Sequence, residues 1–144
     1  MVDILHRVAI KVPREAVYRA ITEPGGLSSW WTSEVEAEAR EGTISVFRFE
    51  AGQVQMRMRV KSLTPGRRVH WLVEEPSPPE WKGTEVTWDL SENDGGTSVF
   101  FGHRGWMSTE QSLPFINYSW GYYLLSLVKY LEEGKGFPHD KPAR

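Results

Sequence analysis

The spacing of apolar residues changes along this chain, and that change constrains the fold more than any other feature. From residue 34 to residue 104 apolar and polar residues alternate, as in Met56–Arg59, and short turn motifs such as Pro65–Gly66 separate the segments. Such alternation is typical of half-buried strands, and the short connections leave no room for long crossover helices. Together with a first strand over Ile4–Ile10, the sequence predicts an antiparallel sheet of six or seven strands.

Helical spacing replaces this alternation at two places. Between Pro13 and Pro24 a short helix follows the first strand, and a second short helical turn covers residues 27–31. One long helix is expected from about Ser112 to Gly134, capped either by Ser112 or by a capping box of Ser108 and Gln111. The fold class is therefore α+β, with residues 1–134 as a single domain and residues 135–144 as a C-terminal tail.

The long helix carries two sets of aromatic residues that point in different directions. At 100° per residue, one apolar stripe contains Ile116, Trp120, Tyr123, Leu124, Leu127 and Leu131. The opposite, polar side contains Ser119, Ser126, Lys129 and Glu133, and its edge carries Phe115, Tyr118 and Tyr122. We expect the first set to face the sheet and the second set to remain available for a homodimer or another protein contact.

Composition excludes several classes of function. A formal charge of −2 argues against binding to a phosphate backbone, so no nucleic acid is expected as a partner. The chain has no cysteine, which rules out disulfides, thiolate catalysis and cysteine-based zinc sites. No apolar run reaches the length of a membrane span, and the charged, alternating N-terminus is not a signal peptide, so a cytoplasmic location is expected. No phosphate loop, dinucleotide glycine pattern or metal-spaced histidine cluster is present, so neither a cofactor nor a metal is expected.

The order of elements and three segments resemble a known family. The segments are VPREAVYRAITEPGGLSSWWT, GTSVFFGHRGW and WGYYLLSLVKYLEEG. They are similar to the helix-grip fold of the SRPBCC, or START-like, superfamily, and within it to the branch named after the C-terminal domain of the heat-shock-protein-ninety ATPase activator. The resemblance implies a curved sheet wrapped around the long C-terminal helix, with an elongated apolar cavity between them.

The inward faces of the predicted strands and helix would line that cavity. Large rings and flexible methionines suit an apolar or aromatic guest, but the same residues would also make a solid core. The candidate ligand-binding residues are Trp31, Phe47, Phe49, Met56, Met58, Trp71, Trp81, Trp88, Phe101, His103, Trp120, Tyr123, Leu124 and Leu127.

Two of these candidates have an alternative structural interpretation. His103 shares the inward face of its strand with Phe101, where it is either an acid–base group or a buried neutral histidine bonded to its neighbours. Trp81 lies in a proline-rich loop over residues 75–83, where it either covers the mouth of a cavity or caps the core.

Three functions follow as hypotheses. The first is a binding module for a small apolar or aromatic molecule. The second is an enzyme of the cyclase, dehydratase or hydrolase type that uses His103, although the sequence favours a non-enzymatic module. The third, implied by the resemblance alone, is a protein-interaction module related to chaperone ATPase activation. The resemblance covers the C-terminal domain of the family's namesake and not the separate N-terminal domain with which that protein grips its chaperone, so we expect this hypothesis to transfer poorly.

Overall fold

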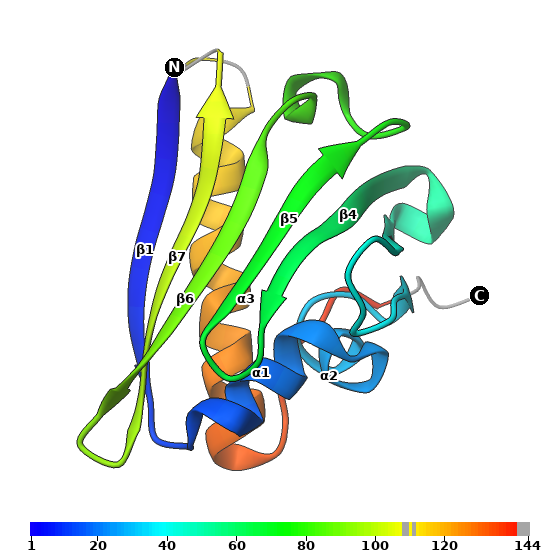
Figure 1. Ribbon diagram of the computed structural model, residues 1–144. Helices are drawn as coiled ribbons and strands as arrows, with labels where there is room; N and C mark the ends of the chain where they lie inside the picture. The colour runs from blue at the N-terminus through cyan, green and yellow to red at the C-terminus, as the bar shows by residue number, and fades with distance from the viewer. Residues whose placement is uncertain (108–109, 111, 141–144) are drawn as a thin grey trace.

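The computed structural model describes residues 1–107, 110 and 112–140, and within them the fold is α+β (Figure 1). Seven strands form one antiparallel sheet, confirming the predicted fold class. The strands are β1 (Val2–Ile10), β2 (Glu34–Glu36), β3 (Ile44–Phe49), β4 (Val54–Thr64), β5 (Arg68–Glu74), β6 (Glu85–Asn93) and β7 (Gly96–Trp106). The helices are α1 (Arg14–Thr22), α2 (Pro24–Trp30) and α3 (Leu113–Glu133), with short 3-10 turns η1 (Glu50–Gly52) and η2 (Pro79–Trp81).

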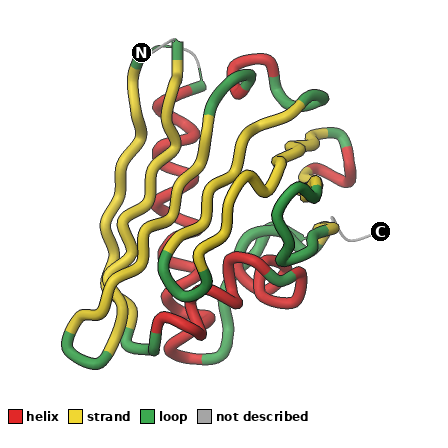
Figure 2. The backbone as a smooth tube through the Cα atoms, in the orientation of Figure 1, coloured by secondary structure: helices red, strands yellow, loops and turns green. Residues whose placement is uncertain are grey.

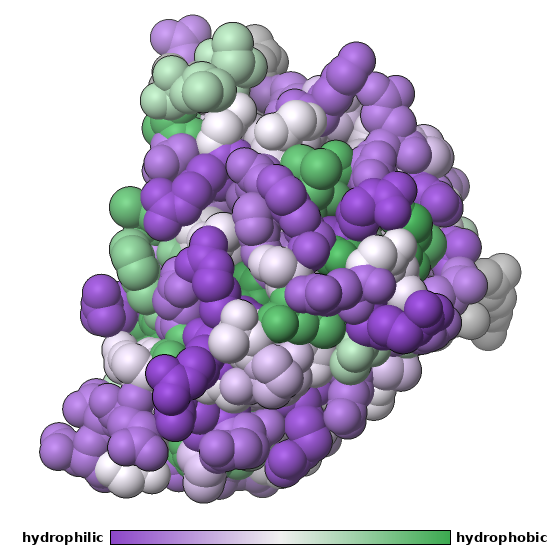
Figure 3. Space-filling view, in the orientation of Figure 1, coloured by the Kyte–Doolittle hydropathy of each residue, from purple (hydrophilic) through white to green (hydrophobic). Residues whose placement is uncertain are grey.

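The sheet order is β1-β7-β6-β5-β4-β3-β2. Strands β2 to β6 each pair with the next strand along the chain, and the last strand, β7, pairs with the first, β1. The β6–β7 hairpin turns through Asp94 and Gly95, both at positive φ, as a tight two-residue loop requires. After the two short helices and the remaining strands, β7 closes against β1. The sheet therefore forms one layer in front of α3, and its outer face is largely hydrophilic (Figures 1 and 3).

The two short helices cover one end of the sheet (Figure 2). They meet closely because Gly26 has no side chain: a Cβ there would lie 2.5 Å from the Cα of Ala20. The indole N–H of Trp30 donates a hydrogen bond of 2.8 Å to the carbonyl of Ala20, which fixes α2 against α1. This arrangement places the buried Trp31, just after α2, beneath the sheet.

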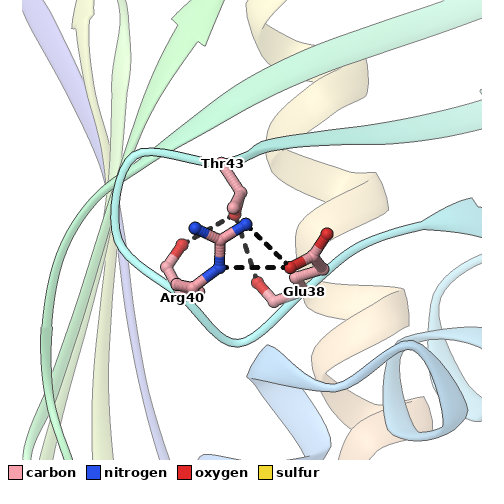
Figure 4. A network of polar contacts seen from close by, with 3 residues as sticks. All are labelled: Glu38, Arg40 and Thr43. Atoms are coloured by element: carbon pink, nitrogen blue, oxygen red, sulfur yellow. Dashed lines mark hydrogen bonds and ion pairs between the residues drawn. The ribbon is translucent and has the colours of Figure 1, made fainter.

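The acidic row around Glu34, Glu36 and Glu38 forms a shorter strand than the alternation predicts. Strand β2 ends at Glu36, whose carboxylate pairs with Arg48 across the β2–β3 ladder. In the connection that follows, Arg40 donates to the carboxylate of Glu38 at 3.1 and 3.2 Å, and Thr43 donates to the carbonyl of Arg40 (Figure 4). These exposed ion pairs agree with a solvated acidic face rather than a metal site.

Helix α3 confirms the inward stripe and corrects one polar assignment. Trp120, Leu124 and Leu127 are buried against the sheet, and Gly134 ends the helix at φ +83°. Ser112 occupies the N-cap position without a side-chain hydrogen bond, whereas Ser108 and Gln111 lie outside the described residues. The helical period predicts Ser126 on the solvent side, but its side chain is buried and 0% exposed.

The burial of Ser126 results from the segment after the helix, which turns back over α3. The hydroxyl of Ser126 accepts a hydrogen bond of 2.7 Å from the backbone N–H of Phe137. Gly136 permits this approach, since a Cβ there would lie 2.6 Å from the carbonyl oxygen of Ser29. Residues 136–140, which we call the C-terminal segment, thus pack on α2 and α3, although the sequence places them in a tail. The division at residue 134 stays a prediction.

Candidate functional site

Aromatic rings fill the middle of the space between sheet and helix. Trp31, at the end of α2, lies 4.3 Å from the ring of Phe47 and 4.9 Å from that of Trp120. Phe101 of β7 lies 4.4 Å from Trp120, and Trp88 of β6 lies 4.8 Å from Phe101. Contacts of this kind add stabilisation beyond the burial of area. This part of the predicted cavity is therefore a solid core.

A pocket of about 440 Å³ lies beside this core, toward the end of the sheet opposite to α1. Its walls come from β3, η1 and β4 on one side and from the first half of α3 on another. The loop between β5 and β6, at the top of Figure 1, and the C-terminal segment supply the rest. The pocket reaches the surface, because Phe115 is 67% exposed and still lines it. The lining is mostly apolar and rich in aromatic rings.

The structure brings six of the predicted ligand-binding residues to the pocket and places the others in the core. The six are Trp31, Phe49, Met56, Trp81, Trp120 and Tyr123. The core contains Phe47, Met58, Trp71, Trp88, Phe101, His103, Leu124 and Leu127, all buried and outside the pocket lining.

Ten further lining residues are not among the predicted site residues. They are Glu50, Val54, Pro78, Pro79, Glu80, Ser112, Phe115, Ile116, Ser119 and His139. Val54 lies on the same inward face of its strand as Met56. Ile116 belongs to the predicted apolar stripe of the long helix. The sequence pattern therefore could have identified both as lining residues. The sequence places Phe115 at the edge of the polar side of α3, but it lies over the pocket mouth as well. Six of the remaining residues come from loops and element ends, whose side-chain directions follow no period: Glu50, Pro78, Pro79, Glu80, Ser112 and His139. Ser119 lies within α3, where the helical period predicts the polar side, but it lines the pocket.

His103 is sealed within the core by three hydrogen bonds in series. Trp120 donates its indole N–H to Nδ1 of His103 at 3.0 Å, so Nδ1 carries no proton. Nε2 is then the protonated nitrogen and donates to the hydroxyl of Thr84 at 2.8 Å. That hydroxyl donates in turn to the carbonyl of Trp81 at 2.6 Å.

Electrostatics agree with this neutral form. Burial lowers the pKa of His103 to about 3, because the charged imidazolium would lose its hydration without gaining a carboxylate partner. The side chain is 0% exposed and does not line the pocket. The nearby strand β1 carries His6, whose ring bonds to the side chain of Asn117 at 3.0 Å. This geometry argues against an acid–base role for His103.

Trp81 combines the two roles that the sequence leaves open. Its ring is buried and lies 4.7 Å from that of His103, so it caps the core. The same residue lines the pocket together with Pro78 and Pro79 of its loop. The loop is held at its other side, where Glu80 accepts a hydrogen bond of 3.1 Å from the backbone N–H of Ser112 at the start of α3.

The C-terminal segment contributes a wall through His139. Its backbone N–H donates to the carbonyl of Trp31 at 2.8 Å, and its carbonyl accepts from Ser33 at 2.9 Å. Nε2 of its ring accepts a hydrogen bond of 3.1 Å from the backbone N–H of Glu50, which identifies Nε2 as unprotonated. The ring also lies 5.2 Å from that of Phe49. His139 thus ties the segment after α3 to both α2 and η1.

Tyr123 carries the phenol of the lining. Its pKa is raised, first by burial and then by the nearby Tyr122 and the carboxylate of Glu50. The phenol therefore stays protonated and can donate a hydrogen bond within the pocket. Among residues 1–107, 110 and 112–140, no cluster of three or more His, Asp or Glu side chains could hold a metal ion. Likewise, no helix in the described part of the chain is long and apolar enough to cross a membrane.

A seven-stranded antiparallel sheet laid on one long C-terminal helix, with an apolar pocket between them, defines a helix-grip domain of the SRPBCC, or START-like, class. The chain belongs to the family of activator of Hsp90 ATPase homolog 1-like proteins, whose model matches residues 11–132. The family resemblance drawn from the sequence is thereby confirmed. None of the curated proteins matches the sequence significantly.

Solved structures agree with this assignment. The chain is 36% identical to the Aha1 dimer from Colwellia psychrerythraea, over 94% of this chain and 100% of that one, with a TM-score of 0.86. DynU16, a putative protein in the dynemicin biosynthetic locus, is 20% identical over 97% of this chain and 51% of that chain, with a TM-score of 0.80. The SSP2350 protein from Staphylococcus saprophyticus is 21% identical over 94% of this chain and 96% of that one, with a TM-score of 0.76. The last two show the shared fold alone.

Proposed function

We propose that this protein binds a small apolar molecule containing an aromatic ring in the pocket between β3, β4 and the first half of α3. The observation that carries the proposal is the pocket itself, with a volume of about 440 Å³. Pockets of several hundred cubic ångströms lined by apolar rings and a few polar groups are typical of small-molecule sites.

The lining residues explain why a ring would be preferred. Trp31, Trp120 and Phe49 offer flat surfaces on which a ring can stack, and Met56 can adjust its conformation to an imperfect fit. The hydroxyl of Ser119 and the phenol of Tyr123 supply polar groups that would fix orientation. Burial of an apolar ligand surface here would contribute about 25 cal/mol per Å² before the entropy lost on binding.

A pocket-filling variant tests the proposal. In Ser119→Trp the new indole would occupy the pocket, whereas Leu125→Trp adds the same group to a half-exposed position of α3 outside it. Binding of 2-naphthalenemethanol, measured by isothermal titration calorimetry and native mass spectrometry, should give a 1:1 complex with wild type and Leu125→Trp. Ser119→Trp should lose about tenfold or more in affinity. No binding by wild type, or equal binding by all three proteins, would overturn the proposal.

A second candidate function is self-association through the outer face of α3. Tyr118 is 72% exposed, and Phe115, Tyr122 and Leu125 lie on the same side of the helix. Exposed aromatic residues along one helix face are typical of protein contacts. The relative from Colwellia psychrerythraea is described as a dimer, which supports a homodimer for this chain as well.

Sedimentation equilibrium tests the homodimer. Tyr118→Lys should shift the molecular mass of the wild-type protein toward that of the monomer, because a charge would be buried in the contact. Leu5→Lys on the outer face of β1 is the matched control, since Leu5 is also an exposed apolar residue. A wild-type monomer, or an unchanged dimer in Tyr118→Lys, would count against this contact. The cytoplasmic location and the link to chaperone ATPase activation stay predictions.

A further inference from the structure

The charged side chains among the described residues that line the pocket are all of one sign. Glu50 of η1 and Glu80 of η2 line it, and among the described lining residues there is no lysine or arginine. His139 adds no positive charge, because its Nε2 accepts a hydrogen bond from the backbone of Glu50. From the described lining, a ligand in this pocket therefore experiences two carboxylates and no basic side chain.

Neither carboxylate is neutralised within the described part of the chain. No basic side chain there forms an ion pair with Glu50 or with Glu80. The nearest cation of the same loop, Lys82, pairs instead with Glu75 at 3.1 Å. Glu80 accepts a hydrogen bond of 3.1 Å from the backbone N–H of Ser112 through one carboxylate oxygen. The charge of Glu50 is felt inside the pocket, where it contributes to the raised pKa of Tyr123.

The backbone of η1 holds Glu50 in an uncommon conformation. Glu50 and Ala51 have φ values of 54° and 56°, a left-handed region that residues other than glycine seldom occupy. The turn is held by hydrogen bonds from Gln53 to the carbonyl of Glu50 and from the N–H of Glu50 to His139. Backbone strain that the surroundings maintain is characteristic of ligand sites.

Aromatic faces beside carboxylates form a suitable environment for a cation. The ring quadrupole attracts positive charge, and the attraction increases where water is excluded. Trp31, Trp81 and Trp120 supply indole rings to this lining, and tryptophan is the strongest partner for such contacts. An anionic ligand would instead meet two like charges.

We propose that the pocket selects cationic ligands: small apolar or aromatic molecules that carry a protonated or quaternary amine, held with the amine toward Glu50 and Glu80. This inference rests on the proposed binding function and specifies the chemical class of its ligand. It also specifies what the site rejects, namely carboxylates and other anions of the same size and shape.

Three probes with one ring system separate charge from shape. They are 2-naphthylmethylammonium, the uncharged 2-naphthalenemethanol and the anionic 2-naphthoate, titrated calorimetrically into wild type at low ionic strength. The ammonium should bind about tenfold or more tightly than the carboxylate, with the alcohol between them. Raising NaCl from about 20 mM to about 500 mM should weaken the binding of the ammonium probe and of neither other probe.

Charge-removing variants assign the effect to the two carboxylates. Glu50→Gln and Glu50→Gln/Glu80→Gln keep the size of the side chains, and glutamine at position 80 still accepts the hydrogen bond from Ser112. Both variants should lose ammonium affinity by about threefold or more while binding the alcohol as wild type does. Glu92→Gln, at the exposed end of β6, is the control and should change neither the affinity for the ammonium nor that for the alcohol.

The outcomes distinguish this inference from the proposed function. If none of the three probes binds wild type, both proposals fail. If the alcohol binds but the carboxylate probe binds as tightly as the ammonium probe or more tightly, the binding function stands and the selection for cations is wrong. The selection for cations by Glu50 and Glu80 is also wrong if the double variant retains the full preference for the ammonium, because that preference would then come from elsewhere.

Discussion

The indole N–H of Trp120 donates a hydrogen bond of 3.0 Å to Nδ1 of His103, and both side chains are buried. This contact joins α3 to β7 at the centre of the molecule and fixes the tautomer of the imidazole. With Thr84 and Trp81 completing the series, every polar atom of the histidine ring has a partner. His103 is therefore a structural residue whose neutrality the fold requires.

The first prediction concerns stability in acid. The pKa of His103 is about 3 in the folded protein, whereas an ordinary histidine in an unfolded chain has a pKa of about 6.5. As pH falls below about 6.5, His103 becomes protonated in the unfolded state but stays neutral in the folded state. The free energy of unfolding therefore decreases between about pH 6.5 and about pH 3. The contribution of this residue should approach about 1.4 kcal/mol per pH unit, measured by urea unfolding at several pH values.

A His103→Gln variant isolates that contribution. Its amide can accept from Trp120 or donate to Thr84 without titrating. The other histidines and the carboxylates are common to both proteins, so only wild type carries the destabilisation from His103 at low pH. The difference in free energy of unfolding between wild type and His103→Gln should therefore narrow as pH falls. Parallel pH profiles for wild type and His103→Gln would show that His103 is not the titrating group.

The second prediction concerns Thr84. Thr84→Val preserves shape but leaves Nε2–H of His103 without its partner. The carbonyl of Trp81 loses the hydroxyl but keeps its hydrogen bond of 3.0 Å from the backbone N–H of residue 84. Each buried polar group left unpaired costs about 1–3 kcal/mol, so the free energy of unfolding should fall by that amount or more. Thr84→Ser retains the hydroxyl and should recover most of the loss. Equal destabilisation by valine and serine would assign the effect to packing instead.

The third prediction concerns attachment of the C-terminal segment. In Gly136→Ala the added Cβ would lie within 3 Å of the carbonyl oxygens of Ser29 and Ser126, which are backbone atoms that cannot rotate away. The segment should detach or shift, at a cost of about 1–3 kcal/mol, and amide exchange at Phe137 and His139 should accelerate.

Gly25→Ala is the matched control for this substitution. A Cβ at Gly25 meets no atom within 4 Å, and alanine favours the helix, so stability should be unchanged or slightly higher. If exchange at Phe137 is unaffected by Gly136→Ala, the hydrogen bond between Phe137 and Ser126 does not depend on this close approach.

The alternation of residues is sufficient to predict the strands, because a half-buried strand imposes period two on its own sequence. The same rule places Phe47, Met58 and Trp88 on the inner face, and all three are buried. It does not separate core from pocket, since that depends on how rings from different elements interdigitate. Trp71 and Trp31 both face inward, yet only Trp31 reaches the pocket.

The polar part of the site lies beyond what local sequence can indicate. Glu50, Glu80 and His139 are each in irregular backbone, far apart along the chain, and only the tertiary fold brings them around one pocket. The burial of Ser126 has the same origin. Its helical position is on the outer side of α3, but the returning C-terminal segment covers it, which no helical period can predict.

The contacts among tryptophans allow excitation energy to pass between the indoles at the pocket and those in the interior. Trp31 and Trp120 face the pocket, and Trp31 also stacks on Trp30 at 5.8 Å and on Trp71 at 6.1 Å. At such separations an excited indole passes its energy to its neighbours faster than it emits light. A guest that quenches Trp31 would therefore dim the emission of the whole group, so the protein's own fluorescence would register occupancy without any attached label.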